Sequence, residues 1–133
     1  QVVNSELVIK VRRMMMGATR SGGTAEDAAI YTYNVAGKTG TSHKNTVGGY
    51  EEKRYVSLFA GIVPAEKPRL VTVVIINDPK AGQHYGGKVA GPVYANVTER
   101  ALRVLRVAPK IENNNRAVVT NHDLDLNQSG GGI

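Results

Sequence analysis

The spacing of apolar positions predicts a helix near the start of the chain. From Asn4 to about Arg20, apolar residues recur at intervals of three and four, which is the spacing of one helical face. They are Leu7, Val11, Met14, Met15 and Ala18. Asn4 or Ser5 can cap this helix, and Gly22 and Gly23 end it. We expect the methionines of the stripe to pack in a core, because flexible thioethers fill irregular gaps.

Three strands follow the helix, at Tyr31 to about Ser42, Tyr55 to Val63 and Leu70 to Ile76. They are rich in β-branched, aromatic and small residues, and turn residues separate them, as in an antiparallel meander. The second strand ends at Pro64. The run from Val71 to Ile76 lacks polar alternation, so we expect the third strand to be covered on both faces.

A second helix is predicted after a Gly86-Gly87 turn, with Pro92 in its first turn. Its apolar stripe has steps of four and comprises Val93, Val97, Ala101 and Leu105. The expected fold class is therefore α+β, with three antiparallel strands flanked by an N-terminal helix and a C-terminal helix that packs on the sheet. Beyond residue 107 no periodicity survives. We assign residues 1–107 to a packed domain and residues 108–133 to a C-terminal tail.

Charge and composition exclude several functions. Seventeen Lys and Arg against eleven Asp and Glu give a net charge of +6, but the basic residues are scattered. The spacing of Arg100, Arg103 and Arg106 is typical of a solvated helix face, so we expect no nucleic-acid partner. The chain has no cysteine, and its three histidines lack the spacing of metal ligands. We therefore expect no disulfide, metal or cofactor.

The string from Ala36 to Thr41 carries the candidate chemistry. A phosphate-binding loop needs a glycine five positions before its Gly-Lys-Thr and a helix after it; here Thr32 takes that position and a polar, glycine-punctuated stretch follows. On a strand that lines a cleft, Gly40 would let a substrate backbone approach, while Lys38 and the flanking hydroxyls would face its carboxylate. Each charge-assisted hydrogen bond of that kind contributes about 1.5–3 kcal/mol.

Several strings occur in one order that resembles the division-specific class B penicillin-binding proteins, over residues 1–107. The strings are Gly22-Gly23-Thr24-Ala25 with Ala28-Ala29, Ala36 to Thr41, Ser57 to Gly61 with Pro64, Val73 to Pro79 followed by Lys80-Ala81-Gly82, Tyr85-Gly86-Gly87, and Gly91-Pro92-Val93. The resemblance implies the C-terminal part of a transpeptidase domain with the fold of penicillin-binding proteins and serine β-lactamases. It also implies that the Lys-Thr-Gly box lies on a strand of the active site.

The activity implied by the resemblance is that of a peptidoglycan D,D-transpeptidase, which cross-links stem peptides during septal cell-wall synthesis and is inhibited by β-lactams. Its serine attacks the penultimate D-Ala carbonyl, D-Ala leaves, and an amine of a neighbouring strand resolves the ester. In this sequence the implied catalytic residues are Lys38, Thr39, Gly40 and Thr41. Lys38 and the two threonine hydroxyls would hold the substrate's terminal carboxylate, and the Thr41 N–H would form half of the oxyanion hole. The implied substrate-binding residues are Thr39, Thr41, Tyr85, Gly86, Gly87 and Tyr50.

The sequence departs from the family pattern because it has neither the Ser-x-x-Lys nor the Ser-x-Asn motif. No serine stands three places before a lysine; the serines are Ser5, Ser21, Ser42, Ser57 and Ser129. Tyr94-Ala95-Asn96 mimics the second motif, but it follows the box on a predicted helix, and we interpret it as helix surface. The chain also starts without a signal-like or membrane-spanning apolar run.

The resemblance therefore implies a partner: the upstream part of the same transpeptidase, carrying the serine and both missing motifs. It further implies binding of stem peptides that end in D-Ala-D-Ala, of β-lactams and of division-complex proteins. The expected location is the periplasmic side of the bacterial inner membrane, with the anchor upstream. Without that upstream part, the chain should expose apolar surface and be marginally stable.

Two alternatives remain open. The missing Ser-x-x-Lys motif favours a non-catalytic module that binds a carboxylate or a peptide without turning it over. A basic RNA-binding module is the weaker alternative, and it would require salt-dependent binding.

Overall fold

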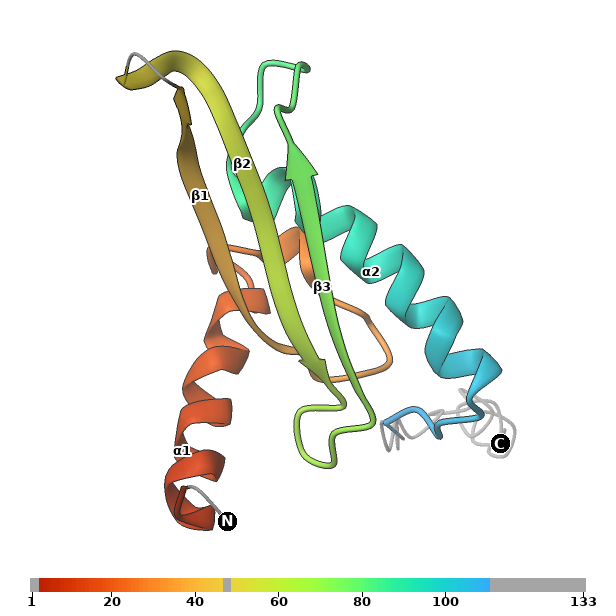
Figure 1. Ribbon diagram of the computed structural model, residues 1–133. Coiled ribbons are helices and arrows are strands. Elements are labelled where there is room, and N and C mark those ends of the chain that lie inside the picture. The colour runs from red at the N-terminus through yellow and green to blue at the C-terminus, as the bar shows by residue number, and fades with distance from the viewer. Residues whose placement is uncertain (1–2, 47–48, 111–133) are drawn as a thin grey trace, which may run out of the picture.

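A three-stranded antiparallel sheet forms the centre of the computed structural model, which describes residues 3–46 and 49–110. The strands β1 (Ala36–Thr46), β2 (Gly49–Val63) and β3 (Leu70–Asn77) lie in the order β1-β2-β3. Helix α1 (Ser5–Met16) precedes the sheet and α2 (Gly86–Val104) follows it. Figure 1 shows α2 crossing one face of the sheet, with α1 beside the lower end of β1. This arrangement confirms the predicted α+β fold class.

Helix α1 begins where the sequence predicts, but it buries little of its apolar stripe. The Asn4 side-chain oxygen accepts a hydrogen bond from the Glu6 N–H at 2.8 Å and so caps the helix. No residue of α1 is buried, and Met14 is 70% exposed. The prediction of a methionine core is therefore wrong for Met14, because α1 packs chiefly beside β1. The α-helix also ends at Met16 and gives way to a short 3-10 helix, Gly17–Thr19.

The strand boundaries agree with the sequence for β3 and for the end of β2, but β2 begins at Gly49 rather than at the predicted Tyr55, and β1 differs as well. Strand β2 ends at Val63, directly before Pro64, and β3 covers the predicted run. The first strand was predicted from Tyr31, but β1 begins at Ala36. Residues 30–33 form a tight turn instead, in which the Tyr33 N–H donates to the Ile30 carbonyl at 3.0 Å. Residues 31–35 therefore form a connection rather than a strand despite their β-propensity, with Tyr33 and Val35 buried and Tyr31 exposed.

Strand β3 alternates between half-buried and exposed residues along its length. Leu70, which pairs with the buried Val63, lies on the α2 side with every second residue after it. The side chains of Val71, Val73 and Ile75 point to the opposite face and are 69%, 56% and 61% exposed. The prediction that β3 is covered on both faces is thus wrong within the described part of the chain. The predicted exposure of apolar surface is confirmed here.

Helix α2 starts earlier than predicted and turns a different face to the sheet. It begins at Gly86, so the glycine pair is its first turn and Pro92 lies inside the helix. The predicted stripe is largely exposed, with Val97 at 54%. Apart from three buried glycines, the buried residues still recur at steps of four, but they are Ala90, Tyr94, Thr98 and Leu102. Tyr94 is fully buried, so its interpretation as helix surface is wrong.

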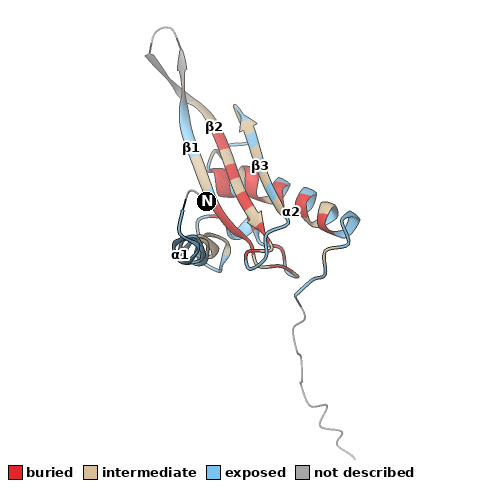
Figure 2. Cartoon of the chain, turned by 60° about the horizontal axis from the view of Figure 1, so that its bottom comes forward, coloured by how far each residue is buried: buried red, intermediate tan, exposed pale blue. Residues whose placement is uncertain are grey.

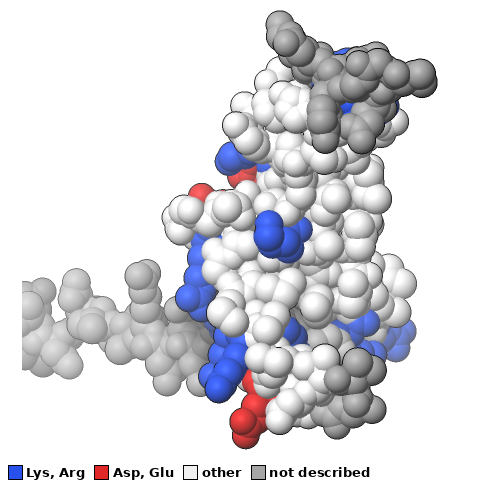
Figure 3. All heavy atoms as spheres, turned by 60° about the vertical axis from the view of Figure 1, so that its left-hand side comes forward, with Lys and Arg blue, Asp and Glu red and all other residues white. Residues whose placement is uncertain are grey.

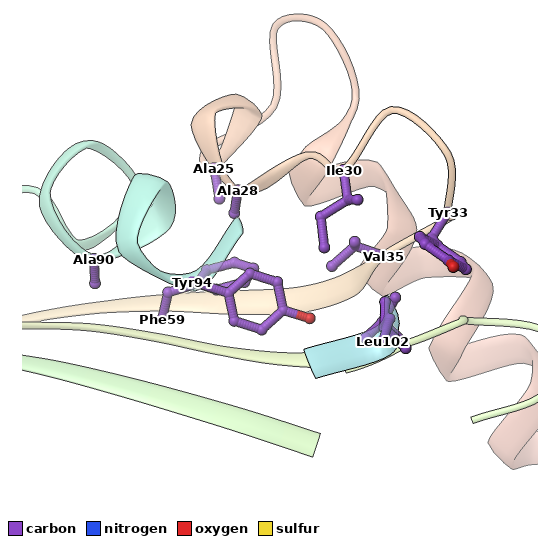
Figure 4. Packing of buried hydrophobic residues seen from close by; sticks show 10 residues of the cluster. Ala25, Ala28, Ile30, Tyr33, Val35, Phe59, Ala90, Tyr94 and Leu102 are labelled. Atoms are coloured by element: carbon purple, nitrogen blue, oxygen red, sulfur yellow. The ribbon is translucent and has the colours of Figure 1, made fainter. Parts of the chain in front are cut away.

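The core lies between the sheet, α2 and the connection that precedes β1. Figure 4 shows Tyr94 from α2 beside Phe59 from β2, with Ala28 and Ile30 of the connection on the same side. The two rings meet edge to face, with centroids 4.7 Å apart. Gly61 makes room for Tyr94, because a Cβ there would lie 2.5 Å from the tyrosine ring. Figure 2 shows the same concentration of buried residues on β2 and α2, while α1 is exposed.

The segment after α2 returns to the connection before β1. The Tyr33 hydroxyl donates to the Val107 carbonyl at 2.7 Å, and the Lys110 N–H donates to the Thr32 carbonyl at 2.8 Å. The tail predicted from residue 108 lies outside the described residues from 111 onward, so the boundary between domain and tail stays a prediction. No helix in the described ranges combines the length and apolar character needed to cross a membrane.

Candidate active site

The Lys-Thr-Gly string lies on an edge strand. Within the described part of the chain β1 pairs with β2 alone, so the other edge of β1 carries backbone groups without a sheet partner. Thr39 lies opposite Phe59, and Thr41 lies opposite Ser57. An edge of this kind can accept an extended peptide as an added strand, with main-chain hydrogen bonds that do not depend on the peptide's side chains.

Alternation along β1 separates the candidate side chains. Residues 37, 39 and 41 face the α2 side of the sheet, where a Cβ on Gly37 would lie 2.2 Å from the Phe59 ring. Lys38 and Gly40 belong to the opposite face. The exposed Lys38 side chain nevertheless curls back, and its ammonium donates to the Thr39 carbonyl at 2.8 Å. The cation and both hydroxyls therefore come from one short segment of strand.

Gly86, the first residue of α2, is in direct contact with the candidate strand. Its N–H donates to the Thr41 hydroxyl oxygen at 3.0 Å. Because this hydroxyl accepts from Gly86, its own proton is free to be donated elsewhere, for instance to a carboxylate. Glycine is needed for this approach: a Cβ on residue 86 would lie 2.2 Å from the Leu58 carbonyl oxygen and 2.4 Å from that of Gly40.

Gly87 makes an equally close approach on the other side of the chain. A Cβ there would lie 2.0 Å from the Thr24 carbonyl oxygen. The glycine pair is therefore wedged between the connection before β1 and the strands β1 and β2. This packing explains why α2 begins with two glycines, although glycine lowers intrinsic helix stability by about 1 kcal/mol per residue. The wedge places the N-terminus of α2, with its partial positive charge, beside Thr41.

The segment between β3 and α2 is held at both ends. At its start the Asp78 N–H donates to the Tyr55 carbonyl at 2.8 Å. The Asp78 carboxylate meets Lys80 at 2.9 Å and Arg54 at 3.0 Å. Hydrogen bonding to Lys80, followed by that to Arg54, outweighs burial and lowers the pKa of Asp78 from its usual value. At the other end the Ser57 hydroxyl donates to the His84 carbonyl.

The structure brings some predicted site residues together and leaves others apart. Lys38, Thr39, Gly40 and Thr41 share one strand, and Gly86 contacts it directly, with Gly87 wedged behind. Tyr85 is 62% exposed at the start of α2. The Tyr50 side chain lies outside the described residues. Sequence reasoning missed the hydrogen bond from the Gly86 N–H to Thr41, because the two residues are 45 positions apart. The glycine pair at residues 86 and 87 was the one signal of a close approach.

Ser57, the serine that lies opposite Thr41, is not placed to act as a nucleophile. Ser57 is fully buried, and its hydroxyl is engaged by the His84 carbonyl. Figure 3 shows the face on which α1 and β1 lie, where Lys and Arg are scattered and outnumber Asp and Glu. The arrangement can therefore bind an anionic group beside an open strand.

The chain belongs to the penicillin-binding protein transpeptidase family, because the model of the penicillin binding protein transpeptidase domain matches residues 1–99. Among curated relatives, the probable peptidoglycan D,D-transpeptidase PenA of Neisseria flavescens is 38% identical over 119 residues, covering 90% of this chain and 30% of the relative. The peptidoglycan D,D-transpeptidase FtsI of Escherichia coli is 38% identical over 109 residues, covering 82% and 18% respectively. The chain thus spans less than a third of these relatives.

Solved structures show the same likeness. The transpeptidase domain of Burkholderia pseudomallei penicillin-binding protein 3 is 38% identical with a TM-score of 0.70, covering 78% of this chain and 31% of that one. Penicillin-binding protein 3 of Mycobacterium tuberculosis, complexed with ampicillin, is 26% identical with a TM-score of 0.72, covering 85% and 27%. The resemblance drawn from the sequence is confirmed at the level of the family and of the fold.

Proposed function

We propose that this chain is the Lys-Thr-Gly part of a peptidoglycan D,D-transpeptidase that cross-links stem peptides in septal wall synthesis and is acylated by β-lactams. The observation that carries the proposal is the hydroxyl of Thr41, which accepts the Gly86 N–H at 3.0 Å and keeps its proton for an anionic ligand. It shares an open edge strand with a lysine and a second threonine. The names of the relatives support the same reaction.

The chain's own residues would recognise the end of the stem peptide. The terminal D-Ala carboxylate would lie against the Thr39 and Thr41 hydroxyls, with the Lys38 ammonium close by as counter-charge. The peptide backbone would lie along the open edge of β1, where Gly40 leaves room. The Thr41 N–H would stabilise the oxyanion that forms on the penultimate D-Ala carbonyl; one such donor contributes about 10²–10³ in rate.

The nucleophilic serine would come from the upstream part of the same transpeptidase, which we propose as the first partner. The exposed apolar face of β3, with Val71, Val73 and Ile75, supports a protein partner on the same side of the sheet as Lys38. Attack by the serine would expel D-Ala, and an amine of a neighbouring strand would release the ester. By extension from the relatives, we place the enzyme at the periplasmic side of the inner membrane with division-complex proteins as further partners.

The test uses the whole transpeptidase that contains this chain. The protein is incubated with a fluorescent penicillin, denatured, and analysed by gel and mass spectrometry. We expect covalent label on the upstream serine, and Lys38→Ala should lower the labelling rate about tenfold to hundredfold, the effect of one charge-assisted hydrogen bond. Lys67→Ala is the matched control, because Lys67 is an exposed lysine in the turn between β2 and β3.

The absence of a Ser-x-x-Lys motif favours a second candidate, a module that binds a carboxylate or peptide without turnover. The same experiment separates the two. If the folded whole protein acquires no label while it still binds a D-Ala-D-Ala peptide reversibly, the transpeptidase proposal is wrong and the binding module stands.

A further inference from the structure

Four rings from three separate segments form a continuous row of ring contacts at one end of the sheet. They are His43 on β1, Tyr55 on β2, and His84 and Tyr85 just before α2. Ring centroids lie 4.5 Å apart for His43 and Tyr55, 4.0 Å for Tyr55 and His84, and 4.5 Å for His84 and Tyr85. Tyr55 and His84 are nearly parallel, with 11° between their planes. We call these four residues the ring stack.

The ring stack follows from the strand register. His43 and Tyr55 are direct partners across β1 and β2, so their side chains leave the same face of the sheet. His84 then lies flat on Tyr55, while its carbonyl accepts the Ser57 hydroxyl. Offset or stacked aromatic pairs contribute about 0.5–1.5 kcal/mol beyond the area they bury. The end of the segment 78–85 is therefore attached to β2 by one ring contact and one hydrogen bond.

The attachment ends two residues before Gly86, whose N–H orients the Thr41 hydroxyl. Thr41 is exposed, so water competes for its hydroxyl, and a single hydrogen bond there would not hold the residues before α2 in place. The ring stack provides a second attachment, because it fixes His84 at the end of the segment 78–85. Because His84 lies two residues before Gly86, a movement of His84 away from Tyr55 can be transmitted to Gly86 and lengthen its 3.0 Å hydrogen bond to Thr41, within the limits that the packing of the glycine pair sets.

We propose that Tyr55 and His84 are positioning residues for carboxylate recognition: their stacked rings hold Gly86 against Thr41, and so aim the Thr41 hydroxyl at the substrate's terminal carboxylate. This inference rests on the proposed transpeptidase function. It predicts that removal of the ring at position 55 or 84 weakens binding of ligands that carry the carboxylate. Removal of the Tyr55 hydroxyl or of the His84 nitrogens should have no such effect.

The experiment compares a penicillin with its methyl ester, which lacks the carboxylate charge, as acylating agents of the whole transpeptidase. Tyr55→Leu and His84→Ala remove a ring; Tyr55→Phe and His84→Phe keep one. Tyr31→Leu is the control, because Tyr31 is 89% exposed and is not a member of the ring stack. For each variant the binding constant and the acylation rate constant are determined separately, and folding is checked by thermal melting.

We expect Tyr55→Leu and His84→Ala to weaken binding of the acid about tenfold with an almost unchanged acylation rate constant, because a carboxylate contact stabilises substrate and transition state alike. The ester should be affected less than twofold, and both phenylalanine variants should behave like the unchanged protein. Equal losses for acid and ester in the folded variants, or no rescue by phenylalanine, would overturn the inference. If the unchanged protein is not acylated by either compound, the proposed function itself has failed.

Discussion

Replacing Gly86 by alanine tests the contact between α2 and the Lys-Thr-Gly strand. The added Cβ would lie 2.2 Å from the Leu58 carbonyl oxygen and 2.4 Å from that of Gly40, whereas real contacts of this kind stay above 3.0 Å. Both obstacles are backbone atoms of paired strands, so the start of α2 must retreat by roughly 1 Å. The Gly86 N–H, now 3.0 Å from the Thr41 hydroxyl, would move to about 4 Å, outside hydrogen-bonding range.

The expected loss of acylation rate follows from the hydrogen bond that Thr41 loses. Without the Gly86 donor the hydroxyl is no longer directed toward the ligand, and a hydrogen bond to a charged group contributes about 1.5–3 kcal/mol. If the proposed function holds, the second-order rate at which a chromogenic cephalosporin acylates the whole transpeptidase should therefore fall about tenfold to hundredfold. Gly17→Ala is the matched control, because Gly17 has φ −60° and no atom within 4 Å of an added Cβ.

The reasoning is refuted if the acylation rate of the Gly86→Ala variant is within twofold of that of the unchanged protein. It is equally refuted if denaturant titration shows that the lost rate matches the unfolded fraction. Either result would mean that the start of α2 supports the fold but does not aim Thr41.

Two further predictions concern stability and pH. The buried Tyr94 hydroxyl lacks a hydrogen bond of good geometry within the described ranges, although the Thr98 side chain lies near it. Tyr94→Phe should therefore raise the free energy of unfolding by about 1 kcal/mol in urea titrations. Burial raises the pKa of Tyr94 above its usual 10.0, so above pH 10 the folded state keeps a proton that the unfolded state loses. The free energy of unfolding should therefore fall above pH 10 by up to about 1.4 kcal/mol per pH unit. The phenylalanine variant should not show this decline. The pKa of Asp78 is lowered from 3.8 by Lys80 and Arg54. The ionised Asp78 carboxylate therefore stabilises the fold above pH 3.8, and this stabilisation is lost as the pH falls below that value. The difference in unfolding midpoint between the unchanged protein and Asp78→Asn should shrink on acidification from pH 7 to pH 3. A constant difference would contradict this assignment.

The elements were predictable from the sequence where local chemistry decides them. Asn4 caps α1, and Pro64 marks the end of β2, because capping and punctuation act over a few residues. The face of α2 was predicted wrongly. Its pattern contains two interleaved stripes with steps of four, and the more hydrophobic one, with Val93 and Val97, is the one left exposed. The core stripe includes Tyr94 and Thr98, whose hydroxyls made it look polar.

The site was predictable in composition but not in geometry. The Lys38 to Thr41 string and the Tyr85 to Gly87 string were both recognisable, yet nothing in the sequence states that Gly86 meets Thr41. That contact depends on how α2 crosses the sheet, which follows from long-range packing of Tyr94 on Phe59. The ring stack was missed for the same reason, since it joins residues from three segments.

The alternation along β3 allows the solubility of the chain to be changed without changing the packing of its core. Leu70, Val74 and Ile76 pack against this chain's own core, whereas Val71, Val73 and Ile75 do not contribute to it. The second set can therefore be redesigned with polar residues without changing the packing that positions Thr41 and Gly86. A soluble, single-chain receptor for carboxylates could be built in this way from β1, α2 and the segment before α2, independently of any catalytic partner.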